Sequence, residues 1–558
     1  MRDEPAEVVH ARLLLAAGAR HPPIIRGAKA SGGCATESPQ AKASPRAHAS
    51  RLGSHGPTGR LRGVIRWVTT PLGARSATLA RTMDTPPLRI GLFGIGLDAY
   101  WRQFAGLEDR LRGYLGRVER KLARPGVEVV NAGLVDTPDR AFAAGRELRR
   151  HDVDVIFLHV TTYALSSTVL PVVMRAKVPV IVLNLAPEPA IDYAAFNAMG
   201  DRTAMTAEWL AHCSACPVPE IANVFRRAGV RFHQVTGVLD EDPACWREVD
   251  AWVEAARVAS GLFGSRLGLI GHYYSGMLDI QTDATLLSAT FGTHVEHIEV
   301  DELSARRRNV READAEARFA EFAQVFDVQA DCPADDLAAA ARTSVALDGL
   351  VADYRLGAMA YYYKGAGVQE NEDTIASIIL GTSLLTARGV PVAGEYEVKN
   401  VQAMKILDLL GAGGSFTEYY AMDFSDDVVI MGHDGPGHVA IAQGRPKVRP
   451  LEVYHGKVGR GVSVEMAVKH GPVTLLSVVE APGGALGLLY AEAESVPGPI
   501  LEIGNTNSRY RFPCGAREFV TRWSGHGPAH HCAVGVGRLG GTIDRLGALL
   551  GLHTVRVC

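Results

Sequence analysis

Residues 89–96, RIGLFGIG, set the pattern that decides the fold, because this apolar run ends in glycines and a polar, amphipathic stretch follows it. The same pattern returns in VEVVNAGLV (Val127–Val135), VDVIFLHV (Val153–Val160) and VPVIVLNL (Val178–Leu185). Continuous apolar strands that alternate with helices are typical of a parallel sheet covered on both faces. The sequence therefore predicts a Rossmann-like α/β domain over residues 86–243.

A second α/β domain of similar build is predicted over residues 244–413. Its strand-like runs are RLGLIGHYYSGMLDI (Arg266–Ile280) and HVEHIEVDEL (His294–Leu303), and SVALDGLVADYRLGAMAYYYKG (Ser344–Gly365) has the pattern of a helix that enters a strand. The interpretation rests on the same alternation of apolar strands with helices.

The pattern changes after Gly413. Short strand-like runs such as VSVEMAVKH and VTLLSVVEA follow one another between Gly, Pro and Asp, without helices until LGGTIDRLGALLGL (Leu539–Leu552). Regular strand–turn spacing of this kind indicates an antiparallel sheet or barrel. We therefore expect two α/β domains with parallel sheets, followed by a mainly antiparallel β domain over residues 414–558.

The composition is that of a soluble, multidomain protein. The chain has 558 residues, of which 47% are hydrophobic, and no run reaches the ~18 apolar residues that a membrane-spanning helix needs. Eight cysteines are scattered along it, which favours the reducing cytoplasm over a secreted scaffold. Cys213 and Cys216 form a lone CxxC, which we interpret as two thiols at a helix end, because no second CxxC completes a zinc site.

The first 82 residues differ from the rest. They hold 13 basic and 4 acidic residues and are rich in Ala, Ser, Gly and Pro, so residues 1–85 are predicted to be a disordered extension. The extension is either a targeting peptide or, since Met83 stands just before the first strand, an untranslated upstream stretch; the lack of a clear amphipathic helix favours the second interpretation. The remainder holds 45 basic and 57 acidic residues, which gives no electrostatic reason to expect nucleic acid as a partner.

A concentration of ligand-type residues lies between Pro391 and His438. It contains Glu395, Glu418, His433 and His438 near predicted turns and strand ends, and GHGPAHHC adds His530 and His531 from far along the chain. Carboxylates combined with imidazoles bind divalent cations, and Mn²⁺ fits this set better than zinc. The alternative is that these are surface acids and capping histidines beside glycine turns.

The residues after Glu395 predict where this carboxylate lies. Glu395 precedes the helix-like VKNVQAMKILDLLG, so we expect it near a helix N-terminus, where a carboxylate is stabilised.

In the first domain, GIGLDAYW lacks the third glycine of a dinucleotide fingerprint. Asp98, Tyr100 and Trp101 could instead line a crevice at the carboxyl end of the sheet, or the aromatic pair could pack at a helix start.

Four separated motifs resemble the L-arabinose isomerase and L-fucose isomerase superfamily. They are AGE ending at Glu395, SFTEYY around Glu418, MGH at His433, and GPAHH at His530 and His531. The corresponding arabinose isomerase segments are of the type AGEGDWK, SFMEDYTYHF, LGSH and GGAHH, and they occur in the same order. The resemblance extends from about Leu88 to the end of the chain.

The resemblance implies an intramolecular oxidoreductase, an aldose–ketose isomerase. Glu395, Glu418, His433 and His531 would bind Mn²⁺ or another divalent cation, Glu395 and Glu418 would be the acid–base pair, and His530 would contact the substrate. His438 then becomes the less favoured ligand. The family also implies a homo-oligomer, a trimer or hexamer, in which the stretch from Gly96 to Trp101 serves a neighbour's active site.

The chain departs from the arabinose isomerase pattern around the sugar. VQENED, with Asn371 before Glu372, stands where that family has TTTFEDL, GLDAYW replaces its SQHLYG type, and HDGPGH replaces SHMLE. We therefore expect Asn371 to contact the substrate, and we expect an aldopentose or a 6-deoxyaldohexose, interconverted with its ketose through a cis-enediol.

Two alternatives remain open at this stage. One is a non-catalytic sugar-binding protein, since two α/β lobes with a hinge also describe such receptors. The other is a metal-dependent hydrolase or lyase that uses the same ligands.

Overall fold

The computed structural model describes residues 87–365, 367–451, 459–481 and 483–558, so the predicted extension over residues 1–85 lies outside the described residues. Within the described residues, no helix is both long enough and apolar enough to span a bilayer.

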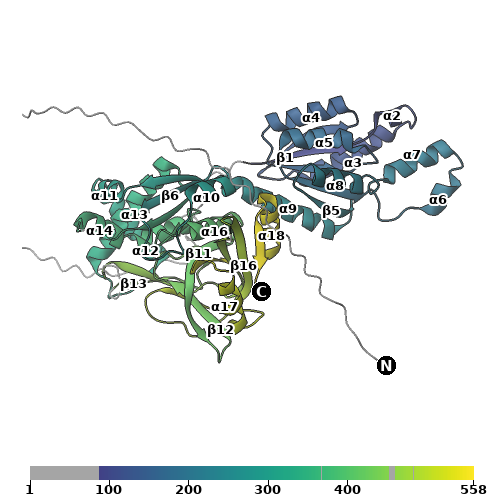
Figure 1. The fold of residues 1–558 in the computed structure, drawn as a ribbon. Coiled ribbons are helices and arrows are strands. Elements are labelled where there is room, and N and C mark those ends of the chain that lie inside the picture. The colour runs from purple at the N-terminus through teal and green to yellow at the C-terminus, as the bar shows by residue number, and fades with distance from the viewer. Residues whose placement is uncertain (1–86, 366, 452–458, 482) are drawn as a thin grey trace, which may run out of the picture. The chain divides into compact units, whose positions relative to one another are not determined.

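The first α/β region is built on a five-stranded parallel sheet of order β2-β1-β3-β4-β5. Figure 1 shows helices lying along this sheet. The order reverses between β1 and β3, the topology of a flavodoxin-like sheet. The strands are β1 (Leu88–Ile95), β2 (Val127–Val135), β3 (Val155–His159), β4 (Val180–Ala186) and β5 (Phe232–Val238), and the helices are α2 (Asp98–Trp101), α3 (Leu107–Leu122), α4 (Pro138–Arg150), α5 (Ser166–Ala176), α6 (Tyr193–Ala198), α7 (Arg202–His212) and α8 (Val218–Arg227).

Both faces of this sheet are covered. Alternate residues of β1 enter two different apolar clusters: Leu92 packs with the cluster that contains α3, and Phe93 packs with the cluster that contains α4, α5 and α8. Successive side chains of a strand point to opposite faces, which explains why this strand is apolar throughout.

The second α/β region contains a four-stranded parallel sheet of order β10-β9-β6-β7. Its strands are β6 (Arg266–Gly271), β7 (His294–Ile298), β9 (Ala358–Tyr362) and β10 (Val392–Ala393). Its helices are α9 (Pro243–Leu262), α10 (Ala284–Phe291), α11 (Val300–Arg308), α12 (Glu312–Val325), α13 (Ala334–Tyr354), α14 (Gln369–Ala376), α15 (Ile379–Ala387) and α16 (Val398–Leu409).

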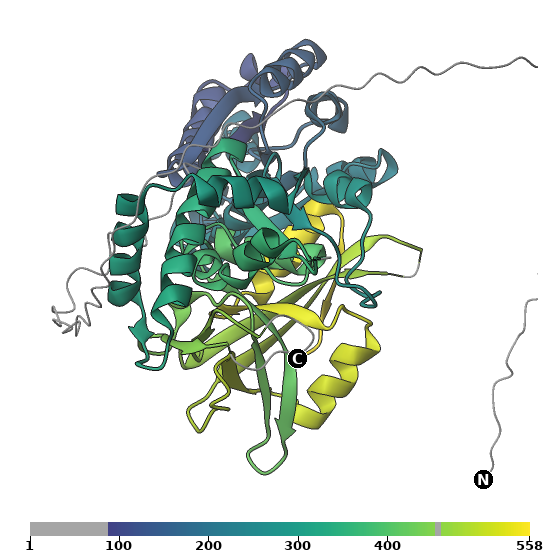
Figure 2. The same ribbon diagram turned by 90° about the vertical axis from the view of Figure 1, so that its left-hand side faces the viewer.

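The C-terminal region is an antiparallel barrel, seen from a second side in Figure 2. Its order is β15-β18-β11-β12-β17-β16, and a further pairing between β16 and β15 closes it. The strands are β11 (Gly413–Asp423), β12 (Val428–His433), β15 (Gly471–Glu480), β16 (Leu486–Ser495), β17 (Thr506–Arg511) and β18 (His531–Val536), with β19 (His553–Arg556) added in parallel to β16. A small sheet joins β8 (Asp327–Val328), β13 (Lys447–Pro450) and β14 (Val462–Glu465), and the helices here are η2 (Val439–Ile441), α17 (Ala516–Gly525) and α18 (Gly540–Leu550).

These regions confirm the predicted fold class: two parallel α/β regions followed by an antiparallel β region. Helix α16 is buried along its whole length, and it contacts β9 and β10 of the second sheet as well as β11, β15 and β18 of the barrel. Because its polar residues are also buried, each needs a partner inside the protein. Lys405, for example, donates to the Gly389 carbonyl oxygen at 2.8 Å.

The cysteines correct one prediction. Cys213 and Cys216 were predicted to be two thiols at a helix end, and the structure joins them in a disulfide just after α7. A second disulfide joins Cys514 and Cys558. A three-residue separation allows the two sulfurs to meet when the chain turns between them, and that turn was not predicted from the local sequence.

Candidate metal centre

The barrel register brings three candidate ligands to one place. Glu418 of β11 pairs with His531 of β18 on one side and with Gly432 of β12 on the other. Directly opposed residues of an antiparallel ladder have Cβ atoms about 5 Å apart, so the side chains of Glu418 and His531 start as neighbours. His433 follows Gly432 and is the last residue of β12.

The fourth candidate, Glu395, lies in the short connection between β10 and α16. Glu395 and Tyr396 have φ values of 58° and 63°, a left-handed conformation that costs roughly 1–2 kcal/mol for each non-glycine residue. Packing offsets that cost: Tyr396 is 4% exposed, and its hydroxyl lies 3.2 Å from Nδ1 of His297. Residues held in this conformation against strain cluster at functional sites.

Helix α16 begins at Val398, and the residue that caps it is Glu397 rather than Glu395. The Glu397 carboxylate accepts from the backbone amides of Lys399 and Asn400 at 3.2 and 3.3 Å. Its second oxygen lies 3.4 Å from Nδ1 of His531. Because Glu397 caps the helix, Glu395, two residues earlier, takes no part in the cap and faces the barrel.

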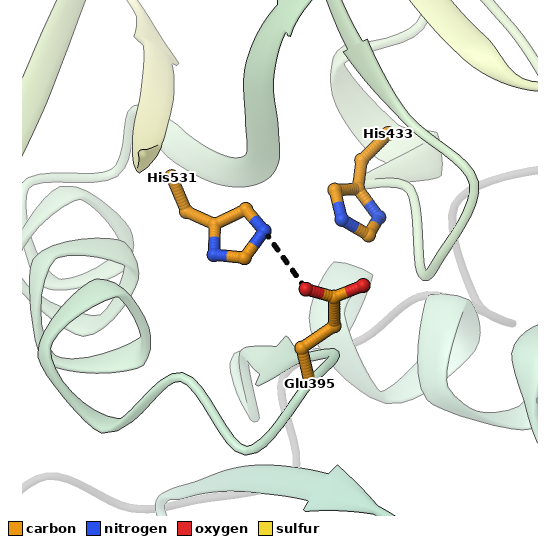
Figure 3. A group of neighbouring side chains, drawn as sticks. All are labelled: Glu395, His433 and His531. Atoms are coloured by element: carbon orange, nitrogen blue, oxygen red, sulfur yellow. Dashed lines mark ion pairs between the residues drawn. The ribbon is translucent and has the colours of Figure 1, made fainter. Parts of the chain in front are cut away.

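Glu395, His433 and His531 form one compact group, drawn in Figure 3. Each offers one ligand atom, and the three atoms lie within 4.8 Å of one another. Nε2 of His531 is 3.4 Å from Oε2 of Glu395. Glu418, His530 and His531 make a second group of the same size, so His531 belongs to both.

The donor set fits a divalent cation. Between them the two groups offer two carboxylates and three imidazoles, and oxygen and nitrogen donors of this kind suit Mn²⁺ and related divalent ions. His433 and His531 are 2% and 1% exposed, and Glu395 is 8% exposed. Buried ionisable groups that lie this close together need a compensating charge or shared protons, which a bound cation would supply.

His531 is the most constrained of these residues. Burial acts most strongly on its ring and disfavours the charged form, but hydrogen bonds and charge interactions with Glu395 and Glu397 outweigh burial and raise the pKa of His531 to about 9. A proton on the ring would balance the charge of the two carboxylates.

Burial also affects the second glutamate. It raises the pKa of the Glu418 carboxyl, His531 and His530 oppose that increase, and the nearby Glu395 adds to it. A carboxyl with a raised pKa is suited to proton transfer near neutral pH. The two glutamates also differ in setting, since the Glu418 side chain is 30% exposed and that of Glu395 is 10% exposed.

The ring of Phe416 packs against the imidazoles of both His433 and His531. Its ring is fully buried, and its centroid lies 4.1 Å from that of His433 and 4.6 Å from that of His531. Phe416 belongs to β11, two residues before Glu418, so both side chains point to the same face of the strand.

A cavity of about 300 Å³ opens beside the group. Glu395 and His433 lie in its wall, together with Tyr361, Tyr362 and Glu372. The other lining residues are Tyr363, Lys364, Gly365, Ile375, Ala376, Ile379, Gly394, Gly435, Leu451 and Arg460. The cavity provides room for a small molecule within reach of both residues.

The remaining predicted residues have different surroundings. His530 approaches the cluster, with Nε2 at 3.9 Å from both Glu395 and Glu418. Asn371 is buried and hydrogen-bonded to Ser304 and Asp301, and the cavity is lined by its neighbour Glu372 instead. His438 is also buried, and its backbone amide donates to Ser415.

The three residues predicted to line a crevice in the first domain lie in α2, just after β1. The indole nitrogen of Trp101 donates to Asp136 at 2.7 Å, and the Tyr100 ring packs edge-on against Trp101 and Phe104. Asp98 is exposed at the start of α2. Within the chain, the aromatic pair is thus engaged in local packing.

Three residues of this site were not singled out from the sequence: Glu397, Phe416 and Asp279. Glu397 carried a usable signal, because a carboxylate just before a helix-like run is stabilised by the N-terminal end of the helix. Phe416 could have been placed by strand alternation with Glu418. No local sequence pattern indicated Asp279, because it contacts His530 through a loop that joins distant parts of the chain.

The fold and the site together define a class: a protein of two parallel α/β regions and an antiparallel barrel, with buried carboxylates and imidazoles grouped beside a cavity. No protein-family model matches the chain. An L-arabinose isomerase from Nocardioides sp. (strain JS614) is 25% identical over 353 residues, which cover 61% of this chain and 68% of that protein. This similarity supports the resemblance of the chain to an arabinose isomerase-like sugar isomerase superfamily.

Two solved structures show only slight similarity. The apo-structure of D-lactate dehydrogenase from Escherichia coli is 11% identical and covers 58% of this chain and 93% of its own, with a TM-score of 0.14. A carbohydrate transporter from Acidothermus cellulolyticus 11B in complex with myo-inositol is 13% identical and covers 55% and 92%, also with a TM-score of 0.14. Neither likeness bears on the fold or the function at that score.

Proposed function

We propose that this protein is a metal-dependent aldose–ketose isomerase, an intramolecular oxidoreductase that acts on an aldopentose or a 6-deoxyaldohexose. The observation that carries the proposal is the convergence of Glu395, Glu418, His433 and His531 from a strained loop and three barrel strands into two groups that share His531. Glu395 and His433 of these groups lie in the wall of the cavity. The homology to an L-arabinose isomerase supports the same reaction class.

The four converging residues would hold Mn²⁺ or another divalent cation. Such a cation, when bound, polarises the sugar carbonyl and acidifies the proton on the neighbouring carbon. Glu395 and Glu418 each have an oxygen 3.9 Å from Nε2 of His530, and in this proposal they share the proton transfers: one carboxylate removes the proton from C2, and a proton returns to C1 through a cis-enediol. Their unequal exposure suits one to act as base and the other as acid.

The surrounding residues have supporting roles in this proposal. His530 would contact a substrate oxygen, since its Nε2 faces both glutamates. The cavity of about 300 Å³ would hold the open-chain sugar. We further propose that the protein acts in the cytoplasm as a homo-oligomer, a trimer or hexamer, in which Asp98, Tyr100, Trp101 and Asn371 complete the substrate site.

The decisive experiment is a panel of aldopentoses and 6-deoxyaldohexoses, incubated with the purified chain and Mn²⁺ in deuterated water. We expect a ketose that carries deuterium at C1, together with deuterium at C2 of the recovered aldose, and the loss of both when the metal is removed with a chelator. Sugar binding without C2 exchange would overturn the proposal in favour of a binding protein. Cleavage products in place of ketose would favour a hydrolase or lyase.

A further inference from the structure

The residue that holds His530 is Asp279, which lies in the loop between β6 and α10. One oxygen of Asp279, Oδ2, accepts two hydrogen bonds from His530: one from the backbone amide at 2.9 Å and one from ring atom Nδ1 at 2.6 Å. The two bonds fix both the backbone and the ring of the same histidine.

The second bond also decides which nitrogen of the ring carries the proton. An ionised carboxylate only accepts hydrogen bonds. Burial raises the pKa of Asp279, but its hydrogen bonds with His530 and the charge interaction with that ring outweigh burial and lower it. Nδ1 must therefore carry the hydrogen, which leaves the lone pair of the neutral ring on Nε2. That atom lies 3.9 Å from a carboxylate oxygen of each of Glu395 and Glu418, too far for a direct hydrogen bond.

Hydrogen bonds to other elements hold the loop that carries Asp279 in place. Nζ of Lys399, in the buried helix α16, donates to the carbonyl oxygens of Asp279 at 2.7 Å and of Gln281 at 3.3 Å. Thr282 donates to Glu480 of β15 at 2.7 Å, and Glu480 lies 3.7 Å from the same ammonium group. Although the Asp279 side chain is 41% exposed, its backbone is thus fixed to the helix that Glu397 caps.

An exposed ion pair alone would contribute little to stability, because water and salt screen the two charges and holding the side chains together costs entropy. Asp279 differs from such a pair in two respects. Its oxygen accepts from the backbone and the side chain of one residue at once, and that residue is the immediate neighbour of His531 in the cluster.

We propose that Asp279 is a positioning residue that holds His530 as its Nδ1–H tautomer, so that Nε2 accepts a hydrogen bond from a substrate hydroxyl beside Glu395 and Glu418. This inference rests on the proposed isomerase function. Without Asp279, the ring would be free to rotate and to place a hydrogen on Nε2, and it would then meet the same hydroxyl as a donor.

A double-mutant cycle tests this role with the Mn²⁺-loaded full chain. We expect Asp279→Ala to lower kcat/KM by about 10-fold or more, as is typical when a partner that orients a site residue is removed. In a His530→Ala background the same change should cost less than about twofold, because non-additivity reports that one residue acts through the other. Asp279→Asn should retain most of the activity, since its amide oxygen can still accept both hydrogen bonds.

Asp283→Asn is the matched control. Asp283 lies in the same loop, caps α10 through the amides of Thr285 and Leu286, and does not contact His530. Asn also caps well, so activity should be unchanged. Unaltered activity in Asp279→Ala, or the same loss in both backgrounds, would overturn the positioning role.

A spectroscopic measurement separates this proposal from the proposed function. In protein labelled with ¹⁵N-histidine and loaded with diamagnetic Mg²⁺, the ring shifts of His530, assigned by their loss in His530→Ala, should report hydrogen on Nδ1. Asp279→Ala should move the ring towards the Nε2–H form. The same tautomer in both proteins would overturn the inference even if the chain proves to be an isomerase, and a tautomer change would support the positioning role even if no aldose in the panel is converted.

Discussion

Glu418 and His531 face each other across the ladder between β11 and β18, although they are far apart in the sequence. The pairing fixes their separation through backbone hydrogen bonds rather than through the two side chains. Glu395 reaches the same point from a strained loop outside the barrel. The candidate centre is thus formed where a rigid barrel meets the N-terminal end of the buried helix α16.

We expect Glu395→Gln and Glu418→Gln each to lower kcat by about 10²-fold or more, because a general acid or base typically contributes that much. Both variants should keep the parent's circular dichroism spectrum, since Gln has nearly the same shape. Glu494→Gln is the control, because Glu494 lies on β16 and pairs at the surface with Arg538. Activity within about tenfold of the parent would remove that glutamate from the acid–base pair.

The raised pKa of His531 predicts how metal binding depends on pH. A cation must displace the proton from this ring, so the affinity for Mn²⁺ should increase with pH until it levels off near the pKa of about 9. Calorimetric titrations in buffers of different ionisation enthalpy should detect close to one proton released per Mn²⁺ near neutral pH. An affinity that does not change between about pH 7 and about pH 9 would contradict the protonated state of His531.

The same shift predicts the stability of the metal-free chain. The folded-state pKa of His531 lies above the ordinary value of 6.5, so the folded state holds the proton more tightly than the unfolded state. The stability that this proton contributes is fully present below about pH 6.5 and is lost as the pH rises through about 9. Urea unfolding of the metal-free chain across that range should show the decrease, and Mn²⁺ should abolish it.

Much of the fold could be predicted from local patterns. Continuous apolar runs such as Val153–Val160 predicted buried parallel strands, and the regular strand–turn spacing after Gly413 predicted the antiparallel region, although helix α17 within it was not predicted. The closure of the barrel by β15 and β16 and the parallel addition of β19 were not predicted, because both depend on pairings between distant segments that leave no local periodicity.

The residues of the candidate site could be predicted from the sequence only in part. His433 was expected at a strand end because VVIMG is a β run that closes in glycines, and it is the last residue of β12. The opposition of Glu418 and His531 depends on strand register, which neither segment encodes alone. The substrate contact expected for Asn371 stays a prediction: its side chain accepts a hydrogen bond from Ser304, and Glu372 beside it lines the cavity.

Glu397 joins the helix cap to the centre, and this double role predicts an unusual loss of stability. Glu397→Ala removes the cap of α16, which costs about 1 kcal/mol in typical helices, and it also leaves the buried Nδ1 of His531 without an acceptor, a further cost of about 1–3 kcal/mol. The measurement is urea unfolding of the metal-free chain at neutral pH.

Asp201→Ala is the control for this variant. Asp201 caps α7 through the amides of Thr203 and Ala204, so its removal tests the cap alone. An equal decrease in the free energy of unfolding for the two variants would show that the contact of Glu397 with His531 contributes nothing. Glu397→Gln should lie between the parent and Glu397→Ala, because its amide oxygen can still accept from the helix amides.

A substitution at Phe416 tests the packing against the two imidazoles without changing a candidate metal ligand. Phe416→Ala should lower the free energy of unfolding by about 3–5 kcal/mol, as for other buried Phe side chains, and it should also weaken Mn²⁺ binding because both imidazoles lose the ring they pack on. Phe322→Ala is the matched control, since Phe322 of α12 is 1% exposed and packs against Phe326, the residue just after that helix. It should lose comparable stability while its Mn²⁺ affinity, measured on the folded fraction, stays at the parent's value. If both variants weaken Mn²⁺ binding equally, Phe416 acts only through global stability and does not orient His433 and His531.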